Sequence, residues 1–346
     1  MRFLSLIKKE FLSIKNDRKS AVIVFIFPFL LTFLFANSVN FEVNNISLGV
    51  LNFSNSKESE RILKNFEGTK RISKIYMLTS FEEAKILIDS EKITTLVIFN
   101  EDFARNKKVE VIVDGRNSNA SQITLGYITS MINEPQFIKI RYLYNPNVEN
   151  FWWILPNLIG LISMAICVIM TAMSIPRELE LGTMEQILVS PLKHFEILLG
   201  KLTTAFLIGL IISFVIFILM ITVFDVPFFG SFWLLFFGIS VFVFSTCATG
   251  IAISVFAKTQ QQAILYSCSY FVPSILLSGF ATPIENMPSW LIPVANCFQL
   301  KHYAIFIKSV ILKDTAFTAL LPELSVMLVL GIFYFILSFI LFKKRF

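Results

Sequence analysis

The sequence has few of the residues that build catalytic and metal sites. Its 346 residues include only 2 His and 4 Cys, and no two cysteines have the CxxC spacing of a redox or zinc motif. A phosphate-binding loop is also missing, because Phe195 stands where a GxxxxGK motif ending at Gly200-Lys201 would need glycine. We therefore expect no ATP hydrolysis, metal site or cofactor on this chain, and we expect the cysteines to be apolar packing residues.

Charge is scarce over much of the chain, and long apolar runs take its place. Hydrophobic residues make up 55% of the sequence, 38 residues are Phe and the mean hydropathy is +0.71, which indicates a membrane protein. Six runs are candidate spans: 20–36, 151–175, 197–224, 230–257, 262–281 and 320–342. Their central parts contain no Asp, Glu, Lys or Arg, and carriers driven by ion gradients commonly need such groups at depth. Energy is therefore expected to arrive through a cytoplasmic contact.

Basic residues at both ends of the chain predict its orientation. Arg2, Lys8, Lys9, Lys15, Arg18 and Lys19 precede the first run, and Lys343-Lys344-Arg345 follow the last. Because Lys and Arg are retained in the cytoplasm, six crossings predict that both termini are cytoplasmic. Under this topology His194 and His302 fall on opposite sides, which excludes a site that uses both. The alternative for residues 1–36 is a cleaved signal peptide, but Leu34 stands where a small residue is needed, so an uncleaved anchor is favoured.

An amphipathic helix is predicted before the first run. Five apolar residues recur there at helical spacing, opposite three lysines: Phe3, Leu4, Ile7, Phe11 and Ile14 against Lys8, Lys9 and Lys15. Such a helix is typical of the cytoplasmic membrane interface. A solvated basic tail is the alternative.

Residues 37–150 have the charge density of a water-soluble domain. They hold 14 Lys or Arg and 14 Asp or Glu, so this stretch is net neutral. Strands are predicted at 46–53, 72–78, 93–99 and 109–113, and helices at 57–66, 81–89 and 119–140, with a Ser80/Glu83 capping box and an Asp114-Gly115 turn. The predicted fold class is an α-helical polytopic membrane protein with six transmembrane helices and a small mixed α/β extracytoplasmic domain between spans one and two.

A short polar loop at 176–196 separates the second and third runs. Its first part, residues 177–191, contains three carboxylates, Glu178, Glu180 and Glu185. A charged loop between two spans is expected either to be held by a cytoplasmic partner or simply to be a solvated face of the protein.

Four sets of motifs carry a resemblance to a known family. They are Lys9-Glu10 with Asn16-Asp17-Arg18 and Pro28; Arg177 to Gln186 with Pro191 and Gly200-Lys201; Thr259 to Gln262 with Pro273 to Phe280, Pro283 and Asn286-Met287-Pro288; and Val113 to Gly115 with Asn117 to Ala120. With these motifs the chain resembles, from end to end, the permease subunits of type-2 ATP-binding-cassette exporters, in the subgroup with a large external domain after the first span. Leu179 departs from the family pattern, which commonly has a basic residue at that place.

The resemblance implies roles for the motif residues. Two permease copies would pair with two separate ATPase subunits, which would hold ATP and Mg²⁺. The loop 176–196 would form coupling helices in a cleft of the ATPase, with Gly182 at a tight turn and Pro191 ending the second helix. The coupling residues would be Arg177, Glu178, Glu180, Gly182, Thr183, Glu185, Gln186 and Pro191. A re-entrant region at 282–313 would close the external end of the pathway, for which an ordinary interfacial loop is the alternative. The gate residues would be Ser278, Gly279, Phe280, Pro283, Met287 and Pro288.

The sequence thus predicts three parts: residues 1–36 with the interfacial helix and first span, the external domain 37–150, and the transmembrane domain 151–346. The predicted function is export of a hydrophobic or amphipathic substrate across a bacterial inner membrane, powered by a separate ATPase subunit. Export of a lipid-linked polymer, or a non-transporting receptor or assembly role, are the alternatives. A second permease copy, the lipid bilayer and a periplasmic adaptor are the other candidate partners, and no nucleic acid is expected.

Overall fold

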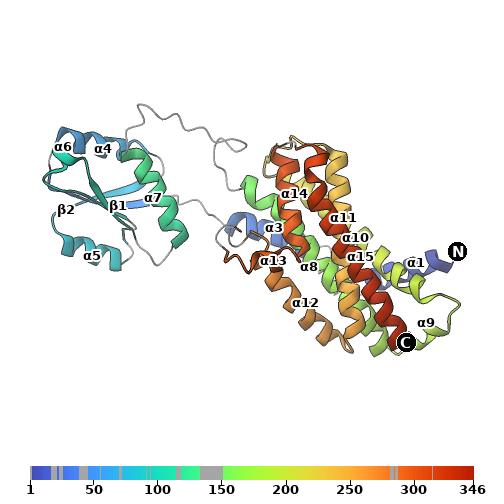
Figure 1. Cartoon of the computed structure of the whole chain (residues 1–346). Coiled ribbons are helices and arrows are strands. Elements are labelled where there is room, and N and C mark those ends of the chain that lie inside the picture. The colour runs from blue at the N-terminus through green and yellow to red at the C-terminus, as the bar shows by residue number, and fades with distance from the viewer. Residues whose placement is uncertain are drawn as a thin grey trace. The chain divides into compact units, whose positions relative to one another are not determined.

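The chain divides into two compact units in the computed structural model (Figure 1). One unit comprises Met1–Val39 and Leu143–Phe346, and the other comprises Asn40–Tyr142. The structure describes residues 2–16, 22, 26–38, 46–54, 56–69, 72–90, 92–93, 95–113, 118–132, 151–280, 284, 287–313 and 315–346.

The smaller unit is built on a four-stranded mixed sheet of order β2-β1-β3-β4. The strands are β1 (Ile46–Asn52), β2 (Ile72–Leu78), β3 (Thr95–Phe99) and β4 (Val109–Val113). Strand β1 pairs in parallel with β2 and β3, and β3 pairs antiparallel with β4. Each parallel pair is joined through a helix, as parallel strands require. The helices of this unit are α4 (Lys57–Glu67), α5 (Phe81–Asp89), α6 (Phe103–Asn106) and α7 (Ser118–Ile132).

Side chains that alternate along the strands form a core on each face of this sheet. On β3, Val97 and Phe99 pack with Phe66 of α4 and Ile128 of α7, whereas the neighbouring positions face α5. Figure 1 shows α4 and α7 on one side of the sheet and α5 on the other. Burial on both faces explains the continuous apolar sequence of the central strands.

The predicted elements of this unit agree closely with the observed ones. Each strand begins and ends within two residues of its predicted bounds, and α5 has the predicted bounds. Ser80 caps α5 by accepting from the amide of Glu83 at 3.2 Å, but the Glu83 carboxylate accepts from the amide of Thr79 instead of completing the box at Ser80. The predicted Asp114-Gly115 turn and residues 133–140 of the last helix lie outside the described residues.

The larger unit is entirely helical over the part of the chain that the structure describes. Its long helices are α8 (Phe151–Glu180), α10 (His194–Thr222), α11 (Phe232–Phe256) and α15 (Phe317–Arg345). Its shorter helices are α1 (Arg2–Asn16), α3 (Phe27–Ser38), α9 (Met184–Val189), α12 (Gln260–Leu276), α13 (Ile292–Ala295) and α14 (Gln299–Lys313).

Among the described residues, four helices of this unit are long and apolar enough to cross a membrane, and they confirm four of the six predicted spans: Ile154–Glu180, His194–Thr222, Phe232–Phe256 and Phe317–Arg345. Helices α8 and α11 are the most buried of the four and α15 the least. The other two spans are not confirmed. The first is only partly described, by Val22 and residues 26–38. Helix α12, in the place of the fifth, has 17 residues, a length of about 26 Å against the roughly 30 Å of hydrocarbon.

Two glycines allow helix α14 to pack closely among the long helices. A Cβ atom at Gly160 of α8 would lie 2.2 Å from the Tyr303 ring, and one at Gly238 of α11 would lie 1.9 Å from the Phe306 ring. Both rings are fully buried. Because glycine leaves room for these rings, α14 packs directly against the backbones of α8 and α11.

Candidate functional site

The predicted polar loop is in large part helical. Helix α8 continues past the apolar run through Arg177, Glu178 and Glu180, which corrects the expectation that a loop begins at residue 176. Arg, Glu and Leu all favour helix, so the sequence Arg177 to Glu180 extends α8 by a turn. Figure 1 places α1, α9 and the C-terminus at this end of the helical unit.

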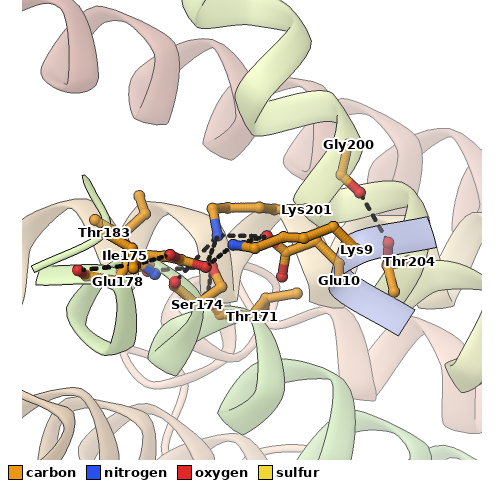
Figure 2. A network of polar contacts seen from close by, with 11 residues as sticks. Lys9, Glu10, Thr171, Ser174, Ile175, Glu178, Thr183, Gly200, Lys201 and Thr204 are labelled. Carbon is orange, nitrogen blue, oxygen red and sulfur yellow. Dashed lines mark hydrogen bonds and ion pairs between the residues drawn. The ribbon is translucent and has the colours of Figure 1, made fainter. Parts of the chain in front are cut away.

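The carboxylate of Glu178 lies inside the protein, where it contacts two lysines that come from distant parts of the sequence. Lys9 of α1 forms an ion pair with it, and the Nζ of Lys201 on α10 lies 3.8 Å away. The hydroxyl of Thr183 donates to its other oxygen. Only 8% of the Glu178 side chain is exposed. Figure 2 shows these side chains converging from three helices.

Lys201 is the most buried member of this charge cluster, since its side chain is fully inaccessible to solvent. Its Nζ lies 2.8 Å from the Glu10 carboxylate of α1 and donates to the carbonyl oxygen of Ser174 at 3.1 Å. Lys9 lies 3.7 Å from the same Glu10. We call Lys9, Glu10, Glu178 and Lys201 the charge cluster. It has two positive and two negative charges, so it joins α1, α8 and α10 without burying a net charge.

Glu180 makes a second connection between helix ends. Its carboxylate accepts from the amide of Gln260 at 2.8 Å and from the side-chain amide of the same residue. Gln260 is the first residue of α12, where free N–H groups and the positive end of the helix dipole favour an anion. Glu180 therefore links the end of α8 to the start of α12.

Gly182 makes the turn between α8 and α9. Its φ is +69°, in the left-handed region that glycine adopts without strain. The amide of Thr183 then donates to the carbonyl of Glu178 at 3.0 Å, which closes the turn. Helix α9 ends at Val189, one residue before Ser190-Pro191. Both Gly182 and Pro191 thus lie at the helix boundaries for which the sequence predicted them.

The outer face of α9 and the turn before it is exposed and partly apolar. Leu181 is 64% exposed and Val189 is 87% exposed. Glu185 is also exposed, and its carboxylate has no hydrogen-bond or ion-pair partner among the described residues. Met184, by contrast, is buried and holds α9 against the core of the helical unit. We call Leu181, Glu185 and Val189 the α9 patch.

A hollow of about 410 Å³ opens beside the α9 patch, between α1 and the turn that follows α9. Lys9 of the charge cluster lines it together with Gln186 and Pro191. The remaining lining residues are Ser5, Leu6, Thr183, Ile187, Ser190 and Leu192. Four of the eight predicted coupling residues, Thr183, Glu185, Gln186 and Pro191, therefore lie around one surface, whereas Glu178 and Glu180 are held by contacts within the chain.

The predicted gate residues all lie in the segment that follows α12. Ser278 is buried, donates to the carbonyl of Ile275 at 2.7 Å and accepts from the amide of Phe280 at 3.1 Å. Gly279, between them, has a φ of +82°. Phe280 is half-buried against the helical core and Met287 is half-buried, Pro288 is exposed, and Pro283 lies outside the described residues.

The sequence alone did not identify the charge cluster as a unit. Lys9, Glu10 and Lys201 belong to motifs that the sequence shows. However, 169 positions separate Lys9 from Glu178, and 191 positions separate Lys201 from Glu10. The buried Lys201 at the start of an apolar helix was the available signal, because a lysine there needs a nearby carboxylate.

The comparisons with known proteins agree with this architecture. The sequence profile of the family described as "ABC-2 family transporter protein" matches residues 20–340. The chain is 30% identical over 334 residues to the probable multidrug ABC transporter permease YbhR of Escherichia coli K12, which covers 91% of each protein. It is 26% identical to the probable multidrug ABC transporter permease YbhS of the same organism, over 99% of this chain and 94% of that protein. It is 24% identical to the inner membrane transport permease YhhJ, over 97% and 95%.

Proposed function

Since the chain belongs to the ABC-2 family of transporter permeases, we propose that it moves a hydrophobic or amphipathic substrate out of the cytoplasm or the inner leaflet, driven by an ATP-binding subunit that docks on the α9 patch. Permeases of this family work with a separate ATP-binding subunit. In this proposal ATP and Mg²⁺ belong to that subunit, and this chain supplies the pathway.

The observation that carries the proposal is the contrast between the two sides of α9. Its inner side is fixed by buried Met184, and its outer side exposes Leu181, Glu185 and Val189. A carboxylate flanked by large exposed apolar side chains is typical of a surface that another protein covers. Gln186 and Pro191 continue the same surface around the hollow.

The charge cluster gives this surface a mechanical connection to the membrane helices. Thr183 lies directly before α9 and donates to Glu178, and Glu178 in turn contacts Lys9 and Lys201. A displacement of α9 would therefore act on α1, α8 and α10 together. In this proposal Glu178 acts within the chain, Glu180 holds the helix end that carries the turn through its bonds to Gln260, and Glu185 contacts the partner.

The substrate class follows from the apolar helices and from the relatives. Two relatives are named probable multidrug permeases, and the spans of this chain are rich in Phe and free of charge at their centres. Both features support a lipophilic, drug-like substrate over a lipid-linked polymer. A second permease copy in an inner membrane, with a periplasmic adaptor, completes the proposed assembly.

A charge reversal on the α9 patch tests the proposal. Glu185→Lys should impair substrate efflux and copurification of the ATP-binding subunit, both normalised to the amount of inserted permease, whereas Glu185→Gln should have a smaller effect. Glu110→Lys is the matched control, because Glu110 is an exposed residue of β4 in the smaller unit, and it should leave both measurements unchanged. Normal efflux and normal copurification in Glu185→Lys would remove the docking role from α9.

A further inference from the structure

Helix α14 brings ionisable side chains into the helical unit, although none of the predicted spans contains one at its centre. Lys301 and His302, in the first turn of α14, are 7% and 6% exposed. His302 contacts Glu323 near the start of α15. Glu323 precedes Arg345 at the end of α15 by 22 residues, or about 33 Å of helix, so this group lies far from the α9 patch.

The two nitrogens of the His302 ring both face acceptors. Nδ1 contacts the Glu323 carboxylate, and Nε2 lies 3.0 Å from the backbone carbonyl oxygen of Asn296. A carbonyl cannot donate a hydrogen bond, and neither can an ionised carboxylate. A neutral imidazole has one N–H group, so it can satisfy only one of these contacts while Glu323 is ionised. The other contact would then bring two lone pairs together.

We propose that His302 and Glu323 form a proton-binding site, and that the bound proton ties the start of α14 to α15. The proton resides either on His302, as an imidazolium beside a carboxylate, or on Glu323, which then donates to Nδ1 while Nε2–H donates to Asn296. Both arrangements hold one more proton than neutral His302 beside ionised Glu323. In both, the two observed contacts are hydrogen bonds.

Lys301 precedes His302 in the chain, and its Nζ donates to the side-chain oxygen of Asn296. Helices α8 and α11 contribute no Asp, Glu, Lys, Arg or His over residues 151–176 and 232–256. The other titratable groups on the elements packed against α14 are Tyr266, Cys268 and Tyr270 of α12, Tyr334 of α15, Cys167 of α8, Cys247 of α11 and Cys297 between α13 and α14. Helix α14 itself also carries Tyr303, Lys308 and Lys313. The charged residues Arg177, Glu178 and Glu180 of α8 and Lys343, Lys344 and Arg345 of α15 lie at the far ends of those helices.

Loss of the proton would weaken the contact of α14 with α15 but not its contacts with α11 and α12. Gln299, the first residue of α14, donates to Thr249 of α11 at 2.8 Å and accepts from the hydroxyl of Tyr270 on α12. These contacts join neutral groups, so they persist when the pH rises. The contact between α14 and α15 depends on the proton, and Glu323, whose side chain is 23% exposed, offers it a route to the surface. The site therefore makes the packing of α14 against α15 sensitive to pH.

The variant Glu323→Gln can keep the contact with His302 without the additional proton. The side-chain amide of Gln can donate to Nδ1 of a neutral His302 while Nε2–H donates to Asn296, so the variant needs no extra proton. We expect the thermal stability of the wild-type permease in membranes to fall as the pH rises from 6 to 9, with the unfolding constant rising by up to tenfold per pH unit, because the folded state binds the additional proton. The Glu323→Gln profile should lack this slope. Glu110→Gln, which removes an exposed carboxylate elsewhere, should follow the wild type.

A local measurement distinguishes the site from a general effect of pH. Cys297 follows Asn296 in the chain and is an exposed thiol. In a Cys268→Ser background, which removes the other exposed cysteine among the described residues, the ratio of Cys297 labelling in the wild type to that in Glu323→Gln should rise with pH. The ratio cancels the ionisation of the thiol itself. Identical pH profiles for wild type and Glu323→Gln in both measurements would overturn the proposal.

Discussion

Lys9 and Lys201 reach the same two carboxylates from different environments. The Lys201 side chain is fully buried, whereas 44% of the Lys9 side chain is exposed. A buried ion pair that loses one partner leaves a charge without compensation, which typically costs about 3–5 kcal/mol, while an exposed pair contributes about 0–1 kcal/mol.

We therefore expect Lys201→Met to destabilise the permease strongly and Lys9→Met to leave its stability nearly unchanged. Thermal unfolding of the two purified variants in the same detergent checks this. Equal melting temperatures for both variants would show that the buried position of Lys201 contributes nothing special to the cluster.

Gly182 offers a second test at a single residue. An added Cβ atom would meet nothing within 4 Å, so a substitution there acts only through the backbone. Asn tolerates a φ of +69° far better than a β-branched residue does. Gly182→Asn should keep most of the efflux activity, and Gly182→Val should lose it through about 1–2 kcal/mol of strain at the turn. Efflux normalised to inserted protein checks the order, and equal activity of the two variants would contradict it.

Single residues were predictable from the sequence where the constraint is local. Gly182 and Pro191 lie at helix boundaries as predicted, because a turn needs a left-handed residue and a proline ends a helix within a few positions. The partners of Glu178 were not predictable, because Lys9 and Lys201 come close to it only after three helices have packed. The sequence predicted that Glu178 faces the ATPase, and the structure points it toward its own chain.

At the scale of elements, strands were easier to predict than the ends of long helices. The strands β2 and β4 have the predicted bounds because charged or turn-forming residues flank each apolar run. Helix α8 extends five residues beyond its predicted end, because residues 177–180 favour helix even though they are polar. Helix α14 was expected in an external region, and its burial depends on two glycines in other helices, which hydropathy cannot reveal.

These glycines predict how α14 responds when a larger residue replaces one of them. Gly238→Ala would place a methyl group against the Phe306 ring, so it should displace α14 and lower stability by about 1–3 kcal/mol. Phe306→Leu in the same chain should recover part of the loss by removing the ring. Gly126→Ala in α7 is the control, since its Cβ atom would meet nothing within 4 Å and alanine favours helix by about 1 kcal/mol. Thermal unfolding of the three variants is the measurement, and a harmless Gly238→Ala would contradict the close packing of α14.

At the scale of the whole molecule, the predicted topology places the smaller unit outside the cell and α9 inside. Single cysteines and an impermeant reagent test it. Asn106 and Val189 are suitable sites because both are exposed, whereas Ser59 is buried and hydrogen-bonded to Ser56. Asn106→Cys should be labelled in intact cells, and Val189→Cys only after permeabilisation. Labelling of position 189 in intact cells would invert the orientation.

Docking of the ATP-binding subunit on α9 is the central claim, and photo-crosslinking tests it most directly. A photoreactive residue at Val189, in cells that also produce the ATP-binding subunit, should yield an adduct of the two proteins. The same residue at Trp233, which is 77% exposed at the start of α11, should not. No adduct from position 189, under conditions in which the two proteins copurify, would contradict the claim and place the contact elsewhere on the permease.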